Sequence, residues 1–488
     1  MADTPVDSGP IRKPGVERWQ TRGVFVAAAV ALACGPAMVW RFPALALKHG
    51  GGNFLVAFAI ALIVTGLPLL VLEFAVGQRT QRAAPRAFRI THRRQEWLGW
   101  VAVSFGLMLA ALNLTLGARA LALAAPAMQA AAEGMERLPT RDPVDFVFRQ
   151  LHGTSGPGGW LFPPWWPVFA LLLLWGVAGG LAGAGPRRFG IPVRMLLAGA
   201  LAVLLAVVVR QLGYLADSSS GAVYGLSYAL DITPSRLLDP ALWLDAFTHA
   251  LLACGVGAGA HVALAACLPH EADTANNGLF VALCSAALSF IIWLGIACML
   301  GMLAMRDGRL MAEVASGASI YQPDGVGLML LTVPQSMLQL DAGADAAHAD
   351  AGWMAALFIA LAVLALTSAI VLLHGAVTAL QQRLARSRMR TALMVATVGF
   401  ALTLALSGIV GWQWFDTADH LIVRLGLPLV ALLQCVSLGW LSGADRWREQ
   451  ITRTSERPVG LFWELTVRII TPLMLILLLV NALTRLAA

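Results

Sequence analysis

The chain contains 488 residues, of which 58% are hydrophobic and only 12% carry a charge. That charged fraction is about half the value for ordinary soluble domains, which excludes a soluble globular fold. We interpret the formal net charge of +7 as a membrane-topology signal, with no support for nucleic-acid binding. The length leaves room for about eleven or twelve helical spans of ~20 residues.

Long apolar stretches recur along the whole chain and predict an all-α integral membrane protein with eleven transmembrane helices. The predicted spans are 23–44, 54–76, 98–125, 164–183, 191–213, 244–268, 278–305, 352–376, 391–410, 420–441 and 461–484.

Glycine interrupts two of these spans. The first span contains Ala33-Cys34-Gly35-Pro36-Ala37, and the sixth contains the stretch Cys254–Gly259, in which every second residue from 255 is glycine. A break frees backbone groups where no water can reach them, so it is tolerated only against protein or a cavity. Two broken spans at equivalent places in two halves predict an inverted-repeat transporter with a central site.

Arginines set the predicted orientation. They cluster before the first span and in the later even-numbered connections, at 79–94, 187–188, 383–390 and 446–453, whereas the alternate connections are acidic or mixed. By the positive-inside rule the N-terminus is cytoplasmic and, after eleven spans, the C-terminus lies outside. We expect a multi-pass protein of the cell inner (plasma) membrane, with no cleavable signal before Arg22.

The ordered set of motifs resembles the neurotransmitter:sodium symporter family over nearly the whole chain. The opening pattern is Trp19, Thr21, Arg22, Gly35, Arg41-Phe42-Pro43, Gly50-Gly51-Gly52, Phe54, Gly66-Leu67-Pro68-Leu69, Glu73 and Gly77-Gln78. Later matches are Trp243, Ala246, Gly255, Gly257, Gly259, Leu366-Thr367-Ser368, Gly443-Ala444-Asp445-Arg446-Trp447 and Arg468-Ile469-Ile470-Thr471-Pro472.

The resemblance implies a LeuT-type fold, in which two five-helix repeats of inverted topology surround unwound helices 1 and 6. The implied organisation is a cytoplasmic N-terminal segment (1–22), the first repeat (23–213), an outer loop (214–243), the second repeat (244–441), a cytoplasmic loop (442–460) and the eleventh helix (461–488). Family members commonly have twelve spans, and this sequence ends after the eleventh.

One sodium site of the family is matched. The resemblance implies backbone carbonyls at Ala31, Cys34 and Leu364, together with the hydroxyls of Thr367 and Ser368. The alternative is that the two hydroxyls merely bond preceding carbonyls of their own helix. In the context of the family we favour the sodium site.

The second sodium site and the chloride site of the family are not matched. Met38 and Ala253 replace two oxygen-bearing side chains of that sodium site, and Ser285 stands at the third position. A thioether is too soft to replace a carboxamide for sodium. Phe58 replaces a tyrosine of the chloride site, which leaves only Ser285 and Ser289. We therefore expect at most one sodium ion per cycle and no chloride dependence.

The substrate class rests on a few positions. Gly35 stands where biogenic-amine transporters carry an aspartate and amino-acid transporters a glycine, which favours an amino acid. Against this, Pro36 has no N–H to grip a carboxylate, and the part of the third span from 106 to 125 contains no tyrosine. Leu252 and Ala258 replace two aromatic pocket residues. The implied substrate-binding residues are Ala33, Gly35, Pro36, Ala37, Leu252, Ala253, Gly255, Gly257, Ala258 and Leu372.

The outer gate of the family is matched and the inner gate is not. Arg41 and Asp419 match the outer pair, and His249 stands where a glutamine usually touches that pair. This imidazole either replaces the amide as a neutral donor or makes the gate pH-sensitive. Val16 and Gln382 occupy both positions of the inner pair, so no inner ion pair is expected.

Glu73 is a carboxylate deep in the second span, where a charge requires a partner. The resemblance implies a structural role, accepting hydrogen bonds from N–H groups freed by the sixth-helix break, and a proton relay is the alternative. His261 and His374 share no metal-binding spacing with each other or with acidic residues, and we interpret them as core histidines.

The leading function is therefore sodium-coupled symport of a small amino-acid-like solute by alternating access. The expected partners are the solute, one sodium ion and the lipid bilayer, with no other cofactor. The alternative is a sodium-independent or proton-driven carrier, or a non-transporting sensor, on the same fold. An intramembrane enzyme has no supporting motif, since neither His-Glu-x-x-His nor Gly-x-Ser-x-Gly occurs.

Overall fold

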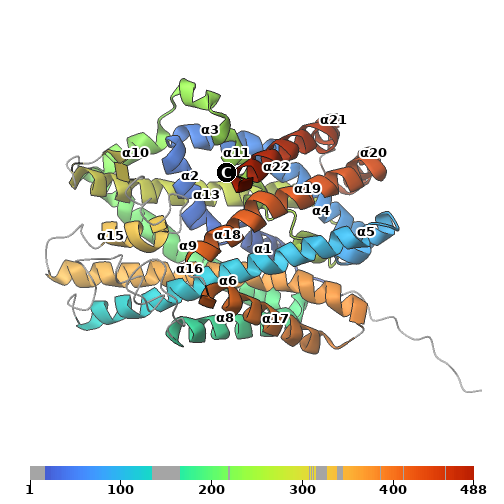
Figure 1. Ribbon diagram of the computed structural model, residues 1–488, viewed down its shortest axis with the longest axis horizontal. Coiled ribbons are helices and arrows are strands. Elements are labelled where there is room, and N and C mark those ends of the chain that lie inside the picture. The colour runs from blue at the N-terminus through green and yellow to red at the C-terminus, as the bar shows by residue number, and fades with distance from the viewer. Residues whose placement is uncertain are drawn as a thin grey trace, which may run out of the picture.

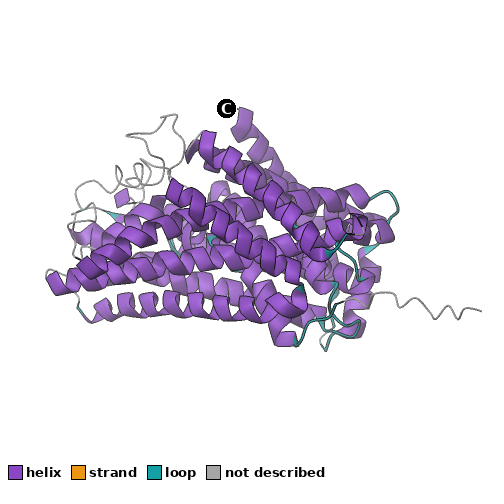
Figure 2. Cartoon of the chain, turned by 90° about the horizontal axis from the view of Figure 1, so that it is seen from below, coloured by secondary structure: helices purple, strands orange, loops and turns teal. Residues whose placement is uncertain are grey.

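The protein is an elongated bundle of helices in the computed structural model (Figure 1 and Figure 2). The structure describes residues 17–133, 165–217, 220–306, 308, 310–311, 313–314, 327–337, 344–384, 386–409, 412–456 and 458–487, and every regular element in these ranges is helical. Val16, the outer-loop residues 134–164 and parts of the connection from 307 to 343 lie outside them.

The helices follow the predicted spans in chain order. They are α1 (Arg22–Ala33), α2 (Ala37–His49), α3 (Gly52–Ala61), α4 (Leu67–Thr80), α5 (Ala84–Thr91), α6 (Glu96–Glu133), α8 (Trp165–Ala184), α9 (Pro186–Gly213), α10 (Ala222–Leu230), α11 (Pro240–Cys254), α12 (Ala260–Ala265), α13 (Thr274–Arg306), α15 (Val333–Met337), α16 (Ala344–Leu384), α17 (Arg388–Ile409), α18 (Trp412–Asp419), α19 (Leu427–Gln434), α20 (Ala444–Thr454), α21 (Leu461–Leu465) and α22 (Thr471–Ala487).

Among the described residues, eight helices are long and apolar enough to cross a membrane, and the bent pair α1–α2 makes a ninth candidate. The two remaining predicted spans, 244–268 and 391–410, coincide with α11 plus α12 and with α17. The count of eleven stays a prediction.

Both predicted breaks are present. The chain bends by 47° between α1 and α2, at Cys34, Gly35 and Pro36. Pro36 is the N-cap of α2, where its missing N–H costs no helical hydrogen bond, because the first N–H groups of a helix have no partner within it. α11 ends at Cys254 and α12 begins at Ala260.

Glycine is required at the second break by backbone geometry. Gly255, Gly257 and Gly259 have φ angles of +63°, +84° and +66°, a region that residues with a side chain rarely enter. Residues in this left-handed conformation cannot continue the helix, so α11 ends at Cys254. The glycine pattern in the sequence thus fixes the unwound segment.

Short π-helical turns connect α-helices in several membrane segments. They are η1 (Leu62–Gly66), η6 (Leu328–Thr332), η7 (His420–Gly426), η8 (Cys435–Leu441) and η9 (Thr466–Ile470). Such turns are uncommon and often mark functional regions. η9 contacts both η1 and η8, so the π turns of three segments meet along the eleventh segment.

Two long helices hold the centre of the bundle. α6 packs along α16, and α1 also contacts α16 (Figure 1). Small residues allow the close approach: Gly117 on α6 faces Ala365 on α16, and Gly106 lies against the carbonyl group of Ala258 in the second break. The two breaks, α6 and α16 therefore surround one region.

Candidate functional site

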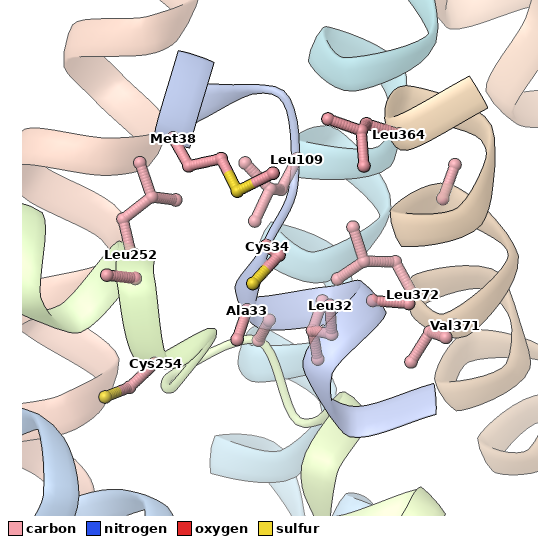
Figure 3. Close-up of a cluster of buried hydrophobic side chains, with 14 of the residues drawn as sticks. Leu32, Ala33, Cys34, Met38, Leu109, Leu252, Cys254, Leu364, Val371 and Leu372 are labelled. Carbon is pink, nitrogen blue, oxygen red and sulfur yellow. The ribbon is translucent and has the colours of Figure 1, made fainter. Parts of the chain in front are cut away.

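The region between the breaks is mainly apolar. Figure 3 shows Cys34 at the turn of the first break, with Leu109 from α6, Leu252 from α11, and Leu364 and Leu372 from α16 around it. All five side chains are buried. An apolar site of this kind leaves orientation and specificity to a small number of polar groups.

Ser368 is the polar side chain of α16 that lies at the first break. A Cβ atom placed on Gly35 would come within 3.2 Å of its Oγ atom. Ser368 also accepts a hydrogen bond of 3.1 Å from Nδ2 of Asn113, which lies on α6. The serine thus connects three segments, and no side chain fits at position 35 without displacing it.

Asn113 is a residue of this site that sequence reasoning missed. The polar residue expected in the third span was a tyrosine. The signal was nevertheless present, because a carboxamide in the middle of an apolar span needs a hydrogen-bond partner.

Thr367 uses its hydroxyl hydrogen locally. Its Oγ1 donates to the carbonyl oxygen of Leu364 at 3.0 Å, as in the alternative interpretation of this residue. The oxygen lone pairs of Thr367 remain free to bind a cation, since a hydroxyl has two acceptor sites besides its hydrogen. Local bonding and cation binding are therefore compatible here.

Two backbone carbonyls at the end of α1 have lost their helical partners. No described residue donates a hydrogen bond to the carbonyl oxygens of Ala31 and Cys34, because the helix stops before the donors that would reach them. Buried carbonyls are normally paired. α1 packs against α16, the helix that carries Leu364, Thr367 and Ser368, and oxygen atoms are the ligands that hard cations prefer.

Positions of the second sodium site have a different chemistry. Met38 is buried with its thioether, and Ser285 donates to the carbonyl oxygen of Ala253 at 2.8 Å. Ser289 is buried, and its hydroxyl has no hydrogen-bond partner among the described residues.

Arg41, which is buried, and Asp419, which is partly buried, form an ion pair that joins α2 to α18. The guanidinium of Arg41 also lies over the ring of Trp40, with 5.0 Å to its centroid. His249 does not bond this pair: neither ring nitrogen has a partner among the described residues. Its ring packs among Phe42, Phe54 and Phe58, with centroid distances of 5.4, 6.3 and 5.5 Å.

Glu73 connects α4 to the second break. Its Oε1 accepts hydrogen bonds from the backbone N–H of Gly257 at 2.9 Å and from Nε2 of Gln434 at 2.8 Å. Oε2 has no partner among the described residues. The carboxylate thus satisfies a donor that the break releases.

Two hydrogen bonds tie the residues before α1 to the end of α12 and the residues after it. Trp19 donates from Nε1 to the carbonyl oxygen of Leu264 at 2.9 Å, and Arg18 bonds the carbonyl oxygen of Leu268. Gln382 accepts from the N–H of Ala83 at 3.4 Å. Val16, its expected counterpart in the inner gate, lies outside the described residues.

The two core histidines have neighbours other than metal ligands. Nε2 of His261 bonds the carbonyl oxygen of Cys254 at 2.8 Å. Nδ1 of His374 accepts from Nη2 of Arg388 at 2.6 Å. Within the described part of the chain no cluster of histidine, cysteine and carboxylate residues has metal-binding geometry.

Comparison with known proteins agrees with this architecture. A family model described as "Sodium:neurotransmitter symporter family" matches residues 16–117 and 194–488. An uncharacterised sodium-dependent transporter of Methanocaldococcus jannaschii is 26% identical over 469 residues, which cover 94% of this chain and 89% of that protein. The sodium- and chloride-dependent neutral and basic amino acid transporter B(0+) of Mus musculus is 24% identical over 530 residues, which cover 96% and 79%.

The fold matches a solved structure almost end to end. The crystal structure of MhsT in complex with L-phenylalanine has a TM-score of 0.75 at 20% identity, covering 96% of this chain and 99% of that one. Fold and matches define a multi-pass transporter of the LeuT type, not an enzyme. The chain belongs to the sodium:neurotransmitter symporter family.

Proposed function

We propose that this protein couples the movement of a small amino-acid-like solute to one sodium ion by alternating access. The observation that carries the proposal is that α1, which ends in the unpaired carbonyls of Ala31 and Cys34, packs against α16, the helix that carries Thr367 and Ser368. Family membership supports sodium as the coupling ion.

The proposed stoichiometry follows from what the other family site has lost. Met38 and Ala253 offer no side-chain oxygen, so the Ser285 hydroxyl is the one side-chain oxygen left at these three positions. A soft sulfur atom does not replace an oxygen ligand for sodium. We therefore propose that one sodium ion is coupled per cycle and that transport does not depend on chloride.

An amino-acid-like solute is favoured by the first break. Ser368 Oγ would lie 3.2 Å from a Cβ at position 35, so an acidic side chain that would bind an amine would have to displace this serine. Around the break, Ala33, Ala37, Leu252, Gly255, Ala258 and Leu372 supply small or apolar contacts. The relative named above that transports neutral and basic amino acids, and the L-phenylalanine in MhsT, support the same class.

The test is a thermal-stability screen of the purified full chain with amino acids and amines, in sodium chloride and in matched choline chloride. A ligand that binds only the folded state raises the melting temperature. We expect one solute class to stabilise the wild type only in sodium, and Thr367→Val with Ser368→Ala to lose this effect. Stabilisation that is equal in choline would contradict sodium coupling and support the alternative, a sodium-independent or proton-driven carrier.

A further inference from the structure

We propose that Asn113 on α6 is the positioning residue that orients the Ser368 hydroxyl for the coupling cation. The inference rests on the proposed sodium site and adds to it a third helix. It starts from one contact: Asn113 Nδ2 lies 3.1 Å from Ser368 Oγ, across 255 positions of sequence.

The side chain of Asn113 on α6 bonds Ser368 on α16. Thr115, two residues further along α6, donates its hydroxyl back to the carbonyl oxygen of Ala111 at 2.8 Å and does not reach across. Around Asn113 the neighbours Leu112 and Leu114 are apolar and buried. The Asn113 carboxamide lies in apolar surroundings and donates a hydrogen bond to Ser368. This bond fixes the rotamer of the serine.

Orientation matters because a hydroxyl has one hydrogen and two lone pairs. Only a lone pair can bind a cation, and the side chain can rotate to present either. When the Asn113 amide donates to Oγ, it occupies one lone pair and fixes the direction of the other. Removing a residue that orients a metal ligand through a hydrogen bond typically lowers metal affinity by about 10- to 100-fold.

The same bond places α6 in contact with the ion site. Ser368 is already close to Gly35 at the first break, so Asn113, Ser368 and Gly35 connect α6, α16 and the end of α1. Movement of α6 away from α16 would release the serine and weaken cation binding. Asn113 thereby connects the packing of a scaffold helix to ion affinity.

The experiment measures the melting temperature of the purified full chain against sodium concentration, with choline replacing sodium at constant ionic strength and no solute added. We expect Asn113→Leu to raise the half-saturating sodium concentration by about tenfold or more and to leave the melting temperature in choline unchanged. Thr115→Val is the matched control on the same helix and should keep the wild-type value.

Asn113→Asp is the second variant, because its carboxylate can accept a hydrogen bond from Ser368 and adds a negative charge beside the cation. Its half-saturating concentration should be at or below that of the wild type. A wild-type value in Asn113→Leu, a lower melting temperature in choline with unchanged sodium dependence, or a tenfold loss in Asn113→Asp would each overturn the role of Asn113.

The failure of the underlying site has a different result. If Thr367→Val with Ser368→Ala loses the sodium response while Asn113→Leu retains it, the sodium site stands and the inference about Asn113 is wrong. A wild type that responds equally to sodium and choline would overturn both the sodium site and the role of Asn113.

Discussion

At the scale of single residues, the site depends on groups whose surroundings leave little freedom. A Cβ at Gly35 would press on Ser368, and Glu73 satisfies a backbone donor in the second break. Both positions were expected to matter from the sequence. The contacts that explain them come from segments hundreds of residues away, which local pattern cannot provide.

Gly35→Ala should weaken sodium binding. The added methyl group would lie 3.2 Å from Ser368 Oγ, closer than an ordinary van der Waals contact, so the serine must shift. We expect a several-fold rise in the sodium concentration that half-saturates thermal stabilisation. Gly176→Ala on α8, where a Cβ meets nothing within 4 Å, is the control. An unchanged sodium response in Gly35→Ala would contradict the close contact.

Glu73→Leu should destabilise the protein and Glu73→Gln should not. Leucine leaves the N–H of Gly257 and the amide of Gln434 unpaired, at a cost of about 1–3 kcal/mol for each buried donor, whereas glutamine keeps an acceptor oxygen. Thermal inactivation followed by size-exclusion chromatography measures the difference. A stable Glu73→Gln protein that has lost all transport would instead support the proton-relay role.

At the scale of helices and their connections, the sequence predicts more of the fold than of the site. Apolar length locates the spans, and the glycine and proline residues locate both breaks. The partner of Ser368 could not be predicted in this way, because neither apolar length nor glycine indicates which face of α6 meets α16. Thr367 shows the same limit. The sequence is the same whether its hydroxyl only bonds the carbonyl oxygen of Leu364 or also binds a cation.

The ion pair between α2 and α18 should limit access to the first break from outside. Cys34 is fully buried at the first break, so its thiol can report access to this region. In whole cells we expect Asp419→Asn to speed the reaction of Cys34 with a membrane-impermeant thiol reagent. The double variant Asp419→Asn with Cys34→Ala assigns the signal, and equal labelling rates with and without Asp419 would exclude a gating role for the pair.

Asp273 ties the start of α13 to the connection after α20. Burial raises the pKa of its carboxyl group, but hydrogen bonds from the N–H groups of Asn276 and Glu456 outweigh burial and hold the pKa below the ordinary value. A lowered pKa means that the carboxylate stabilises the fold above its ordinary pKa and that this stabilisation is lost as the pH falls through the lowered value. Melting temperatures of the wild type and Asp273→Asn should therefore differ at neutral pH and converge in acid. A constant difference at all pH values would contradict this.

At the scale of the whole molecule, side-chain contacts hold both ends of the first broken span against other helices. Lys48 and His49 on α2 both bond Asp245 on α11, at 2.9 and 2.8 Å, on the same side as the Arg41–Asp419 pair. Trp19, before α1, bonds Leu264 at the end of α12, and Arg18 bonds Leu268 just after it.

The predicted orientation of the chain places the N-terminus in the cytoplasm and the C-terminus outside, because arginines are concentrated in the even-numbered connections. Alkaline phosphatase fused after Ala488 should be active, and a fusion after Glu456, in the preceding connection, should be inactive. An inactive C-terminal fusion with an active one at Glu456 would reverse the orientation.

The π turns described above have a consequence for how this chain is compared with its relatives. One extra residue in an α-helix rotates everything beyond it by about 100°, which would turn a packed face toward lipid. A π turn absorbs the extra residue within a single turn, as at 62–66, 420–426, 435–441 and 466–470. An alignment with a relative that lacks one of these turns must therefore place a one-residue gap inside it, and the packing faces on either side then remain equivalent.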